Sequence, residues 1–582
     1  MTVVRVLSFD HSSLPRDYPR HYLPAKVDLA DTVQLKSLFD QLEEKPTRSR
    51  GELEKWLEHE SELLSAVTEE QYLRYIRMTC QTDDPVREKA HLDFIEHVEP
   101  EVKLRSFQLD RKYLASPGRK ELEPDRFSVL DRRKENGVSI FREENVVLEK
   151  EDAKLGQKYQ KITGAMSVFY NGEERTMQQM NKFLEEPDRA VREKTWLLSE
   201  ERRFKDHQAL NQIYDELLET RARISKNAGF DNYRDYMFRK LYRFDYTPED
   251  CVRFHEAVEK HIVPLARELD EERKRKLGVE VLRPWDMQVD PDSLPPLRPF
   301  KDSHDLLEKS ATVFDKLHQE LGKNFRRMTR LNLLDLDSRK GKAPGGYNYE
   351  LTEVRLPFIF MNSVGREGDM RTLLHESGHA FHVFATRDRN LHFQLRGENI
   401  PSEFAEVASQ AMELLAGEHL EGVFYNHADA VRSKREHLTS LVRLLPWVAT
   451  IDAFQHWVYT HPGHSVADRE NYWVKLKERF GGGDSWEDYE QYWRSRWQRQ
   501  LHLYLYPFYY IEYGISLLGA FGVWYNFRKD AAKGVKAYLD ALSLGGSKPL
   551  PMLFQAAGVP FDFGPKTIEP YARELRKILI PN

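Results

Sequence analysis

The segment LLHESGHAFH, residues 373–382, places three histidines and a glutamate in an otherwise apolar stretch. In a helix with about 3.6 residues per turn, His375, His379 and His382 fall within an arc of roughly 60°. Two imidazoles one turn apart can bind the same metal ion. Glu376, at the border of that arc, can reach a water molecule on such an ion without binding the metal. The spacing therefore indicates a metal site with its own base.

This pattern, H-E-x-x-H, is that of zinc peptidases, but a chain with 21 histidines shows it by chance on the order of a few per cent of the time. The alternative is a helix face that is merely rich in histidine. A true site requires an amphipathic helix and a third, acidic ligand from another element. The apolar residues from Met370 to Ala385 recur at helical spacing, with Asp369 as the expected N-cap.

A candidate third ligand lies in NIPSEFAEVASQAMELL, residues 399–415, where Ser402 is the expected N-cap of a second helix. One face of this helix is apolar, and the opposite arc of roughly 80° holds Glu403, Glu406, Gln410 and Glu413. Such a row of acids is often solvent-exposed, and that alternative stays open. If this helix packs beside the histidine helix, Glu406 would complete a His-His-Glu site and leave one position for water.

Two neighbours of these ligands receive supporting roles. Glu403 is a candidate to orient a ligating histidine through its second ring nitrogen. We expect His382 to support or pack rather than to bind the metal, because a catalytic zinc needs its fourth position free.

A third segment, QLHLYLYPFYYIEYGIS at residues 500–516, is crowded with tyrosine, and Pro507 is placed to open a helix. Tyr506, Tyr510 and Tyr513 would then share one helix face. The simpler interpretation is an aromatic core stripe. In a peptidase, however, neutral donors of this kind are needed where the oxyanion of a tetrahedral intermediate develops.

The elements that must position these residues are mostly amphipathic helices. One exception lies near residues 162–177, where alternating residues followed by Asn171-Gly172 predict a hairpin. Another lies at residues 331–365, where short β-type runs lead into the histidine helix. Within it, LPFIFMN at residues 356–362, with Phe360, is the candidate strand whose edge binds an extended substrate. The alternative is a buried strand without substrate contact.

Composition excludes several classes of function. The chain of 582 residues has a net charge of −6, which gives no electrostatic footprint for nucleic acid. The most apolar run, residues 514–524, is too short to span a bilayer, and the N-terminus lacks the pattern of a signal peptide, so we expect a cytoplasmic protein with no membrane partner. Cys80 and Cys251 have no partner at ligand spacing, which argues against a disulfide framework or a thiolate metal site.

The run from His375 through GENIPSEFAEVASQAME resembles the thimet oligopeptidase, neurolysin and oligoendopeptidase F family of zinc metallopeptidases. The segments GAMSVFYNGEERTMQQMNKFLEEPDRAVREKTW, DLDSRKGKAPGGY and LSLGGSKPLPMLFQAAGV extend the resemblance, which is closest to the oligoendopeptidase F-type subgroup. It begins near residue 155, and the first hundred or so residues resemble nothing specific. The resemblance implies one zinc ion on His375, His379 and Glu406, with Glu376 as the base; other divalent ions could substitute. Glu413 matches a further acidic position.

The resemblance also implies roles for the tyrosine segment. His502, Tyr506 and Tyr513 match the histidine and tyrosines that the family places at the oxyanion, with Tyr513 as the first choice and Tyr510 as a neighbour. The spacing between the histidine and the tyrosines departs from the thimet-type pattern by about one residue, which makes His502 the least secure match.

The implied fold is mainly α, a two-lobed helical zincin-like metallopeptidase with a deep central channel and a small β-sheet beside the metal site. We divide the chain into an N-terminal helical lobe, residues 1–205, and a zinc peptidase region, residues 206–582. The implied function is hydrolysis of internal bonds in short unstructured peptides. A zinc carboxypeptidase on a similar scaffold and a non-catalytic peptide-binding homologue are the alternatives, and the oligomeric state does not follow from the sequence.

Overall fold

The computed structural model describes residues 10–389, 391–394 and 399–581. Helices make up 69% of the chain and strands 5%, which confirms the mainly helical prediction. Residues 1–139, 297–434 and 519–561 form one compact unit, and residues 140–296, 435–518 and 562–582 form the other. Both units contain residues from each side of position 205, and the division into lobes there stays a prediction, as does the channel between them.

The first unit begins with five helices; four of them share one apolar core, to which the short helix of residues 85–93 contributes no buried side chain. They are α1 (Thr32–Glu44), α2 (Arg50–Cys80), α3 (Pro85–Asp93), α4 (Glu99–Ala115) and α5 (Pro124–Ile140). The longest of them, α2, starts at a capping box in which Ser49 and Glu52 satisfy each other's backbone amides. Its Trp56 is fully buried and donates its indole N–H to the carbonyl of Leu42 over 2.9 Å. Amphipathic spacing and caps thus explain this part of the fold.

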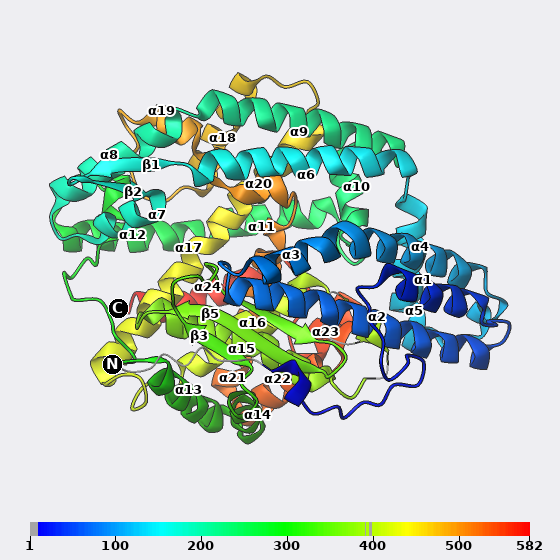
Figure 1. The fold of residues 1–582 in the computed structure, drawn as a ribbon. Helices are drawn as coiled ribbons and strands as arrows, with labels where there is room; N and C mark the ends of the chain where they lie inside the picture. Colours follow the sequence, from blue (N-terminus) through cyan, green and yellow to red (C-terminus); the bar gives the residue numbers. More distant parts are fainter. Residues whose placement is uncertain (1–9, 390, 395–398, 582) are drawn as a thin grey trace. The chain divides into compact units, whose positions relative to one another are not determined.

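The remaining elements of this unit include the helices α13 (Ser303–Leu317), α14 (Gln319–Arg330), α15 (Glu367–Thr386), α16 (Ser402–Gly417), α22 (Ala531–Leu542) and α23 (Leu550–Ala556). A three-stranded sheet of β3 (Leu334–Asp337), β4 (Tyr347–Leu351) and β5 (Leu356–Ser363) lies against α15, as Figure 1 shows in green. This is the small sheet that the sequence led us to expect beside the histidine helix.

The order of strands in this sheet is β3-β5-β4, so β5 is the central strand. It pairs in parallel with β3 and antiparallel with β4, and its backbone groups are therefore used on both sides. The prediction that the edge of residues 356–362 binds substrate is wrong for this reason. The edges of the sheet are β3 and β4.

The helices α15 and α16 lie side by side and cross at Gly378 (Figure 1). A Cβ atom at this position would lie 2.5 Å from the carbonyl oxygen of Ala408 and 2.6 Å from the Cα of Ser409, closer than atoms can pack. Only glycine allows this approach. The glycine within H-E-S-G-H therefore allows α15, which carries the histidines, to pack closely against α16, which carries the acids.

The predicted N-caps of these two helices are both displaced. α15 is capped at Arg366, and Asp369 lies at its third position, where its carboxylate accepts from the backbone N–H groups of Val364 and Arg366. Ser402 is the first residue of α16, after Pro401 at the N-cap. An acid at the third position can accept from the backbone amide of the cap residue, as in one half of a capping box, which explains why Asp369 lies inside the helix.

The second unit is helical apart from one hairpin. Its helices are α6 (Glu143–Gly164), α7 (Met177–Asn181), α8 (Arg189–Phe204), α9 (His207–Asn227), α10 (Tyr233–Lys240), α11 (Pro248–His261), α12 (Val263–Leu277), α18 (Val466–Phe480), α19 (Glu490–Arg494), α20 (Leu501–Leu505) and α24 (Pro565–Leu579). The helices α17 (His427–Thr460) and α21 (Tyr510–Lys529) contribute residues to both units. Among the described residues, no helix has the length and apolar character needed to cross a membrane.

The hairpin consists of β1 (Ser167–Tyr170) and β2 (Glu173–Thr176), which pair antiparallel. Its two turn residues, Asn171 and Gly172, have φ angles of 54° and 82°. Positive φ at both positions is what a two-residue hairpin turn requires, and asparagine and glycine adopt it readily. The hairpin predicted near residues 162–177 is confirmed.

Candidate metal centre

The two helices that cross at Gly378 bring His375, His379 and Glu406 together. The Oε2 atom of Glu406 lies 3.4 Å from Nε2 of His375 and 3.7 Å from Nε2 of His379. One ligand atom from each of the three residues lies within 4.8 Å of the others. The two imidazole rings stand nearly perpendicular, at 87°, with centroids 5.1 Å apart. Residues from two sequence segments thus converge on one point, as the His-His-Glu hypothesis requires.

Hydrogen bonds from outside hold these side chains in place. The hydroxyl of Ser409 donates to Oε2 of Glu406 over 2.8 Å, and Nδ1 of His375 donates to Oε1 of Glu413 over 2.7 Å. With Nδ1 bonded to Glu413, Nε2 of His375 is the nitrogen on the side of Glu406, and it can bind a metal when it gives up its own proton. Glu413 therefore orients His375, and the orienting role of Glu403 toward a ligating histidine stays a prediction. The spacing of seven residues between Glu406 and Glu413, two helical turns, was the signal for it.

Charge and burial act in opposite directions within this group. Burial alone would raise the pKa of Glu406, but the imidazoles of His379 and His375 and the hydroxyl of Ser409 lower it to about 2. Burial would lower the pKa of His375, whereas Glu406 and Glu413 raise it well above its ordinary value. Glu406 is accordingly an ionised carboxylate at neutral pH, the form in which it can bind a cation.

Replacing Glu413 by Gln is expected to weaken metal binding by about 10- to 100-fold, because the amide holds the His375 ring less firmly and no longer increases its basicity. Competition against a metal buffer of known affinity measures this change. Glu413→Asp, which keeps the charge, is the matched variant and should recover part of the affinity. Equal affinity of Glu413→Gln and the unchanged protein would show that this hydrogen bond does not orient the ligand.

The other residues of the first unit that were predicted to serve the site are all buried. Glu376 follows His375 on α15 and is 7% exposed, and Glu403 on α16 is 3% exposed. His382 is fully buried and packs edge-on against the ring of Phe404, with centroids 6.1 Å apart, and its supporting role beside the metal stays a prediction. Phe360 is also fully buried and stacks on Tyr347 at 4.7 Å. A substrate-binding role for Phe360 is therefore wrong, because its ring lies inside the sheet packing.

The tyrosine segment belongs to the second unit, and its helix is interrupted. His502 lies on α20 and Tyr510 and Tyr513 on α21, while Tyr506 lies between the two helices and is 57% exposed. Pro507 restricts the backbone of Tyr506, and Phe508 has a φ of 66°, so the chain turns here instead of forming one continuous helix. The prediction that Tyr506 shares a helix face with the other tyrosines is wrong.

These rings nevertheless gather around His502. Its centroid lies 4.9 Å from that of Tyr510, 6.0 Å from that of Tyr513 and 6.1 Å from that of Tyr506. Tyr509, which the sequence analysis missed, stacks on His502 at 6.1 Å and meets Tyr513 at 5.3 Å. Burial lowers the pKa of His502, so its imidazole is neutral at neutral pH. The segment thus forms an aromatic cluster with polar tips.

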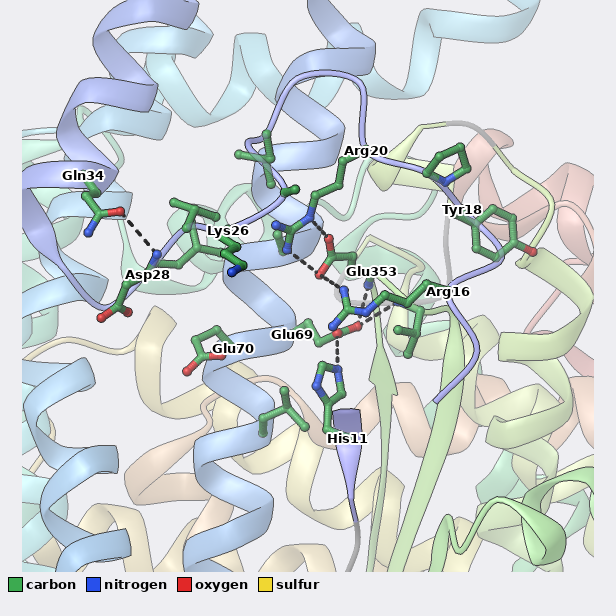
Figure 2. Close-up of a pocket in the computed structure, with 18 residues that line it drawn as sticks. His11, Arg16, Tyr18, Arg20, Lys26, Asp28, Gln34, Glu69, Glu70 and Glu353 are labelled. Atoms are coloured by element: carbon green, nitrogen blue, oxygen red, sulfur yellow. Dashed lines mark hydrogen bonds and ion pairs between the residues drawn. The ribbon is translucent and has the colours of Figure 1, made fainter. Parts of the chain in front are cut away.

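The first unit also contains a large cavity that is not part of the predicted metal site. Figure 2 shows its lining of residues from the N-terminal segment, α2 and the turn after β4, including Arg20, Glu69 and Glu353. Its volume is about 1000 Å³. Arg20 pairs with Glu353, and Glu69 accepts from the backbone of Glu353 and Val354. None of the predicted metal ligands lines this cavity.

The donor set of the His-His-Glu group fits a divalent metal ion. Two imidazole nitrogens and one carboxylate oxygen are the ligands of a catalytic zinc site, and they leave one position open. The hydrogen bonds of Glu413 and Ser409 hold two of the three ligands in advance, as metal sites require. The sequence hypothesis of an incidental histidine-rich face does not account for this convergence.

Comparisons with known proteins show the family of the chain. Residues 182–564 match Peptidase family M3, and residues 25–141 match the Peptidase M3 N-terminal domain. The second match covers a region in which the sequence analysis found no resemblance.

Two curated proteins are similar to the chain. Oligopeptidase PepF of Bacillus subtilis is 27% identical over 262 residues, which are 42% of this chain and only 37% of that protein. An oligoendopeptidase F homolog of Borreliella burgdorferi is 23% identical over 443 residues, 70% of each chain. Among solved structures, Pz peptidase A with an inhibitor has a TM-score of 0.85 and 29% identity, over 96% of this chain and 99% of that one. These likenesses confirm the resemblance to the oligoendopeptidase F-type subgroup, and the chain belongs to peptidase family M3.

Proposed function

We propose that this protein is a zinc-dependent oligoendopeptidase that hydrolyses internal bonds of short, unstructured peptides. The observation that carries the proposal is the convergence of His375, His379 and Glu406 from two helices, with Glu376 next to the first histidine. The names of the similar proteins, oligopeptidase and oligoendopeptidase F homolog, support the same substrate class.

His375, His379 and Glu406 would hold the ion. When bound, zinc supplies a Lewis acid that lowers the pKa of water and polarises a carbonyl group. The residues of the chain supply the remaining chemistry. The carboxylate of Glu376 accepts a proton from the attacking water and returns it to the nitrogen of the leaving amine, as one group can act first as base and then as acid.

Tyr513 remains our candidate for the donor to the oxyanion, a role that rests on its match to the family. Tyr513→Phe removes only the hydroxyl and is expected to lower kcat about 100-fold while KM changes little, because the bond strengthens only as negative charge develops. Tyr509→Phe, on the same cluster, is the matched control. Equal loss in both variants would show a structural role of the cluster.

Two alternatives differ in what they predict for the substrate. A carboxypeptidase needs a cationic group for the terminal carboxylate of the substrate. A peptide-binding homologue would keep the metal and lose the base, whereas Glu376 is present. The names of the similar proteins, oligopeptidase and oligoendopeptidase F homolog, favour the endopeptidase.

The decisive experiment uses a ladder of unstructured peptides of increasing length, each with a free and an amidated C-terminus, with and without a chelator. Mass spectrometry should find internal cuts that ignore the amide, disappear with the chelator and fade in the longest peptides. Stepwise loss from free C-termini alone would identify a carboxypeptidase. Metal binding without any cleavage would favour the peptide-binding protein.

A further inference from the structure

A second group of metal-ligating side chains lies inside the second unit. Cys251 and His255 are one turn apart on α11, and Asp452 and His456 are one turn apart on α17. One ligand atom from each of Cys251, Asp452 and His456 lies within 4.8 Å of the others, and all three residues are buried. We propose that Cys251, Asp452 and His456 bind a zinc-class divalent ion that joins α11 to α17, apart from the ion at His375 and His379.

The carboxylate of Asp452 is at the centre of the group. Its Oδ2 atom lies 2.8 Å from Nε2 of His255 and 3.3 Å from Nε2 of His456. Within the part of the chain that the structure describes, its Oδ1 atom has no hydrogen-bond partner, and the 3.3 Å approach of Nε2 of His456 to Oδ2 lacks the geometry of a hydrogen bond. Asp452 is fully buried, and an unsatisfied carboxylate oxygen in such a place is costly. A cation bound to Oδ1 and to the imidazole would satisfy both atoms.

The charges of the group also favour a divalent ion. The salt bridges of Asp452 within the described ranges are to histidines alone, and Arg479, the nearby guanidinium on α18, pairs with Glu259 at 2.7 Å. A thiolate from Cys251 and the carboxylate of Asp452 together carry two negative charges, which one divalent ion neutralises. A neutral cluster is far less costly to bury than a lone carboxylate.

The types of ligand select the class of metal. Thiolate and imidazole favour zinc and its neighbours among the transition metals over magnesium or calcium, which take oxygen ligands. His255 donates to the carboxylate that would bind the ion and so fixes the orientation of that ligand, as groups around metal ligands commonly do.

The surroundings indicate a structural role. The ring of His456 meets Phe238 edge-on at 6.1 Å and Phe508 at 5.6 Å, and the ring of His255 meets Phe480 at 6.3 Å. These apolar rings pack against the group, and Cys251, Asp452 and His456 are all buried, whereas catalytic sites need access for substrate. The ion would therefore join α11 and α17, two helices that are far apart in the sequence.

Cobalt replacement tests this site separately from the His-His-Glu site. Thiolate bound to Co²⁺ gives a strong near-ultraviolet charge-transfer absorption, and the His-His-Glu site contains no thiolate. The full-length chain loaded with Co²⁺ is expected to show this absorption and to bind two ions per chain. Cys251→Ser should abolish the absorption and lower the content from two ions to one.

Cys80→Ser is the matched control and should change neither quantity. Cys80 belongs to neither group of metal-ligating side chains found among the described residues. The absence of the charge-transfer absorption in the unchanged protein, or its persistence in Cys251→Ser, would overturn the proposal. The first of these outcomes needs no variant, so the test holds even if Cys251→Ser fails to fold. Peptide cleavage does not enter either readout.

Discussion

Glu376→Gln is expected to retain its metal and to lower kcat for peptide cleavage by about 1000-fold or more. The amide has nearly the shape of the carboxylate but cannot accept a proton from water, and general base catalysis contributes about 100- to 10,000-fold. The group His375, His379 and Glu406 does not include this side chain among its ligand atoms, so the metal content should not change. Steady-state kinetics with a short quenched peptide, together with metal analysis of the same sample, measures both quantities.

A matched control lies on the same helix. Glu367 is in the first turn of α15, and its carboxylate pairs with Arg371 at 3.2 Å, two turns before the histidines. Glu367→Gln is expected to change kcat by less than about tenfold, because it alters the end of the helix and not the reacting groups. A metal-loaded Glu376→Gln variant that cleaves peptide at the original rate would remove Glu376 from the mechanism.

Glu406→Ala is expected to lose the ion of the His-His-Glu site and with it all metal-dependent cleavage. The two histidines that remain supply no negative charge, and the loss of one of three protein ligands leaves a site that binds zinc far more weakly. Metal analysis after dialysis measures the loss. In the Cys251→Ser background the metal content should fall from one ion per chain to none.

Ser409→Ala distinguishes the loss of the Glu406 carboxylate from the loss of the hydrogen bond that holds it. It removes only the hydroxyl that donates to Oε2 of Glu406 over 2.8 Å, and the carboxylate stays. We expect this variant to keep its metal after dialysis, with an affinity lowered by about 10- to 100-fold at most. Retention of the catalytic ion and of cleavage by Glu406→Ala would show that another residue is the third ligand.

The sequence by itself determined the part of the site that depends on local geometry. The spacing of four residues between His375 and His379 puts two imidazoles on one face of any helix, and the apolar residues around them, such as Leu373, Leu374 and Phe381, predict that the helix is buried on another face. The same argument placed Glu406 on a second helix. The hairpin at Asn171-Gly172 is equally local, because two positive φ angles determine it.

The sequence was less accurate about where the helices begin and end. From the third position of α15, Asp369 accepts from the backbone amides of Val364 and Arg366 just before the helix, because a side chain can reach back as well as forward. Tyr506 shows the limit of periodicity, since Pro507 and the positive φ of Phe508 end the helix within a pattern that otherwise continues.

Only the tertiary structure decided which side chains meet. Strand order made β5 central, and no property of residues 356–362 reveals the partners on both sides of it. The contact of Gly378 with Ala408 put Glu413, and not Glu403, on Nδ1 of His375. Cys251 shows the same limit most clearly. The sequence argued against a thiolate site because no ligand lay at close spacing, yet the packing of α11 on α17 brings Asp452 to it from about 200 residues away. Distances between helices depend on the packing of whole surfaces, whereas spacing along the chain describes one helix at a time.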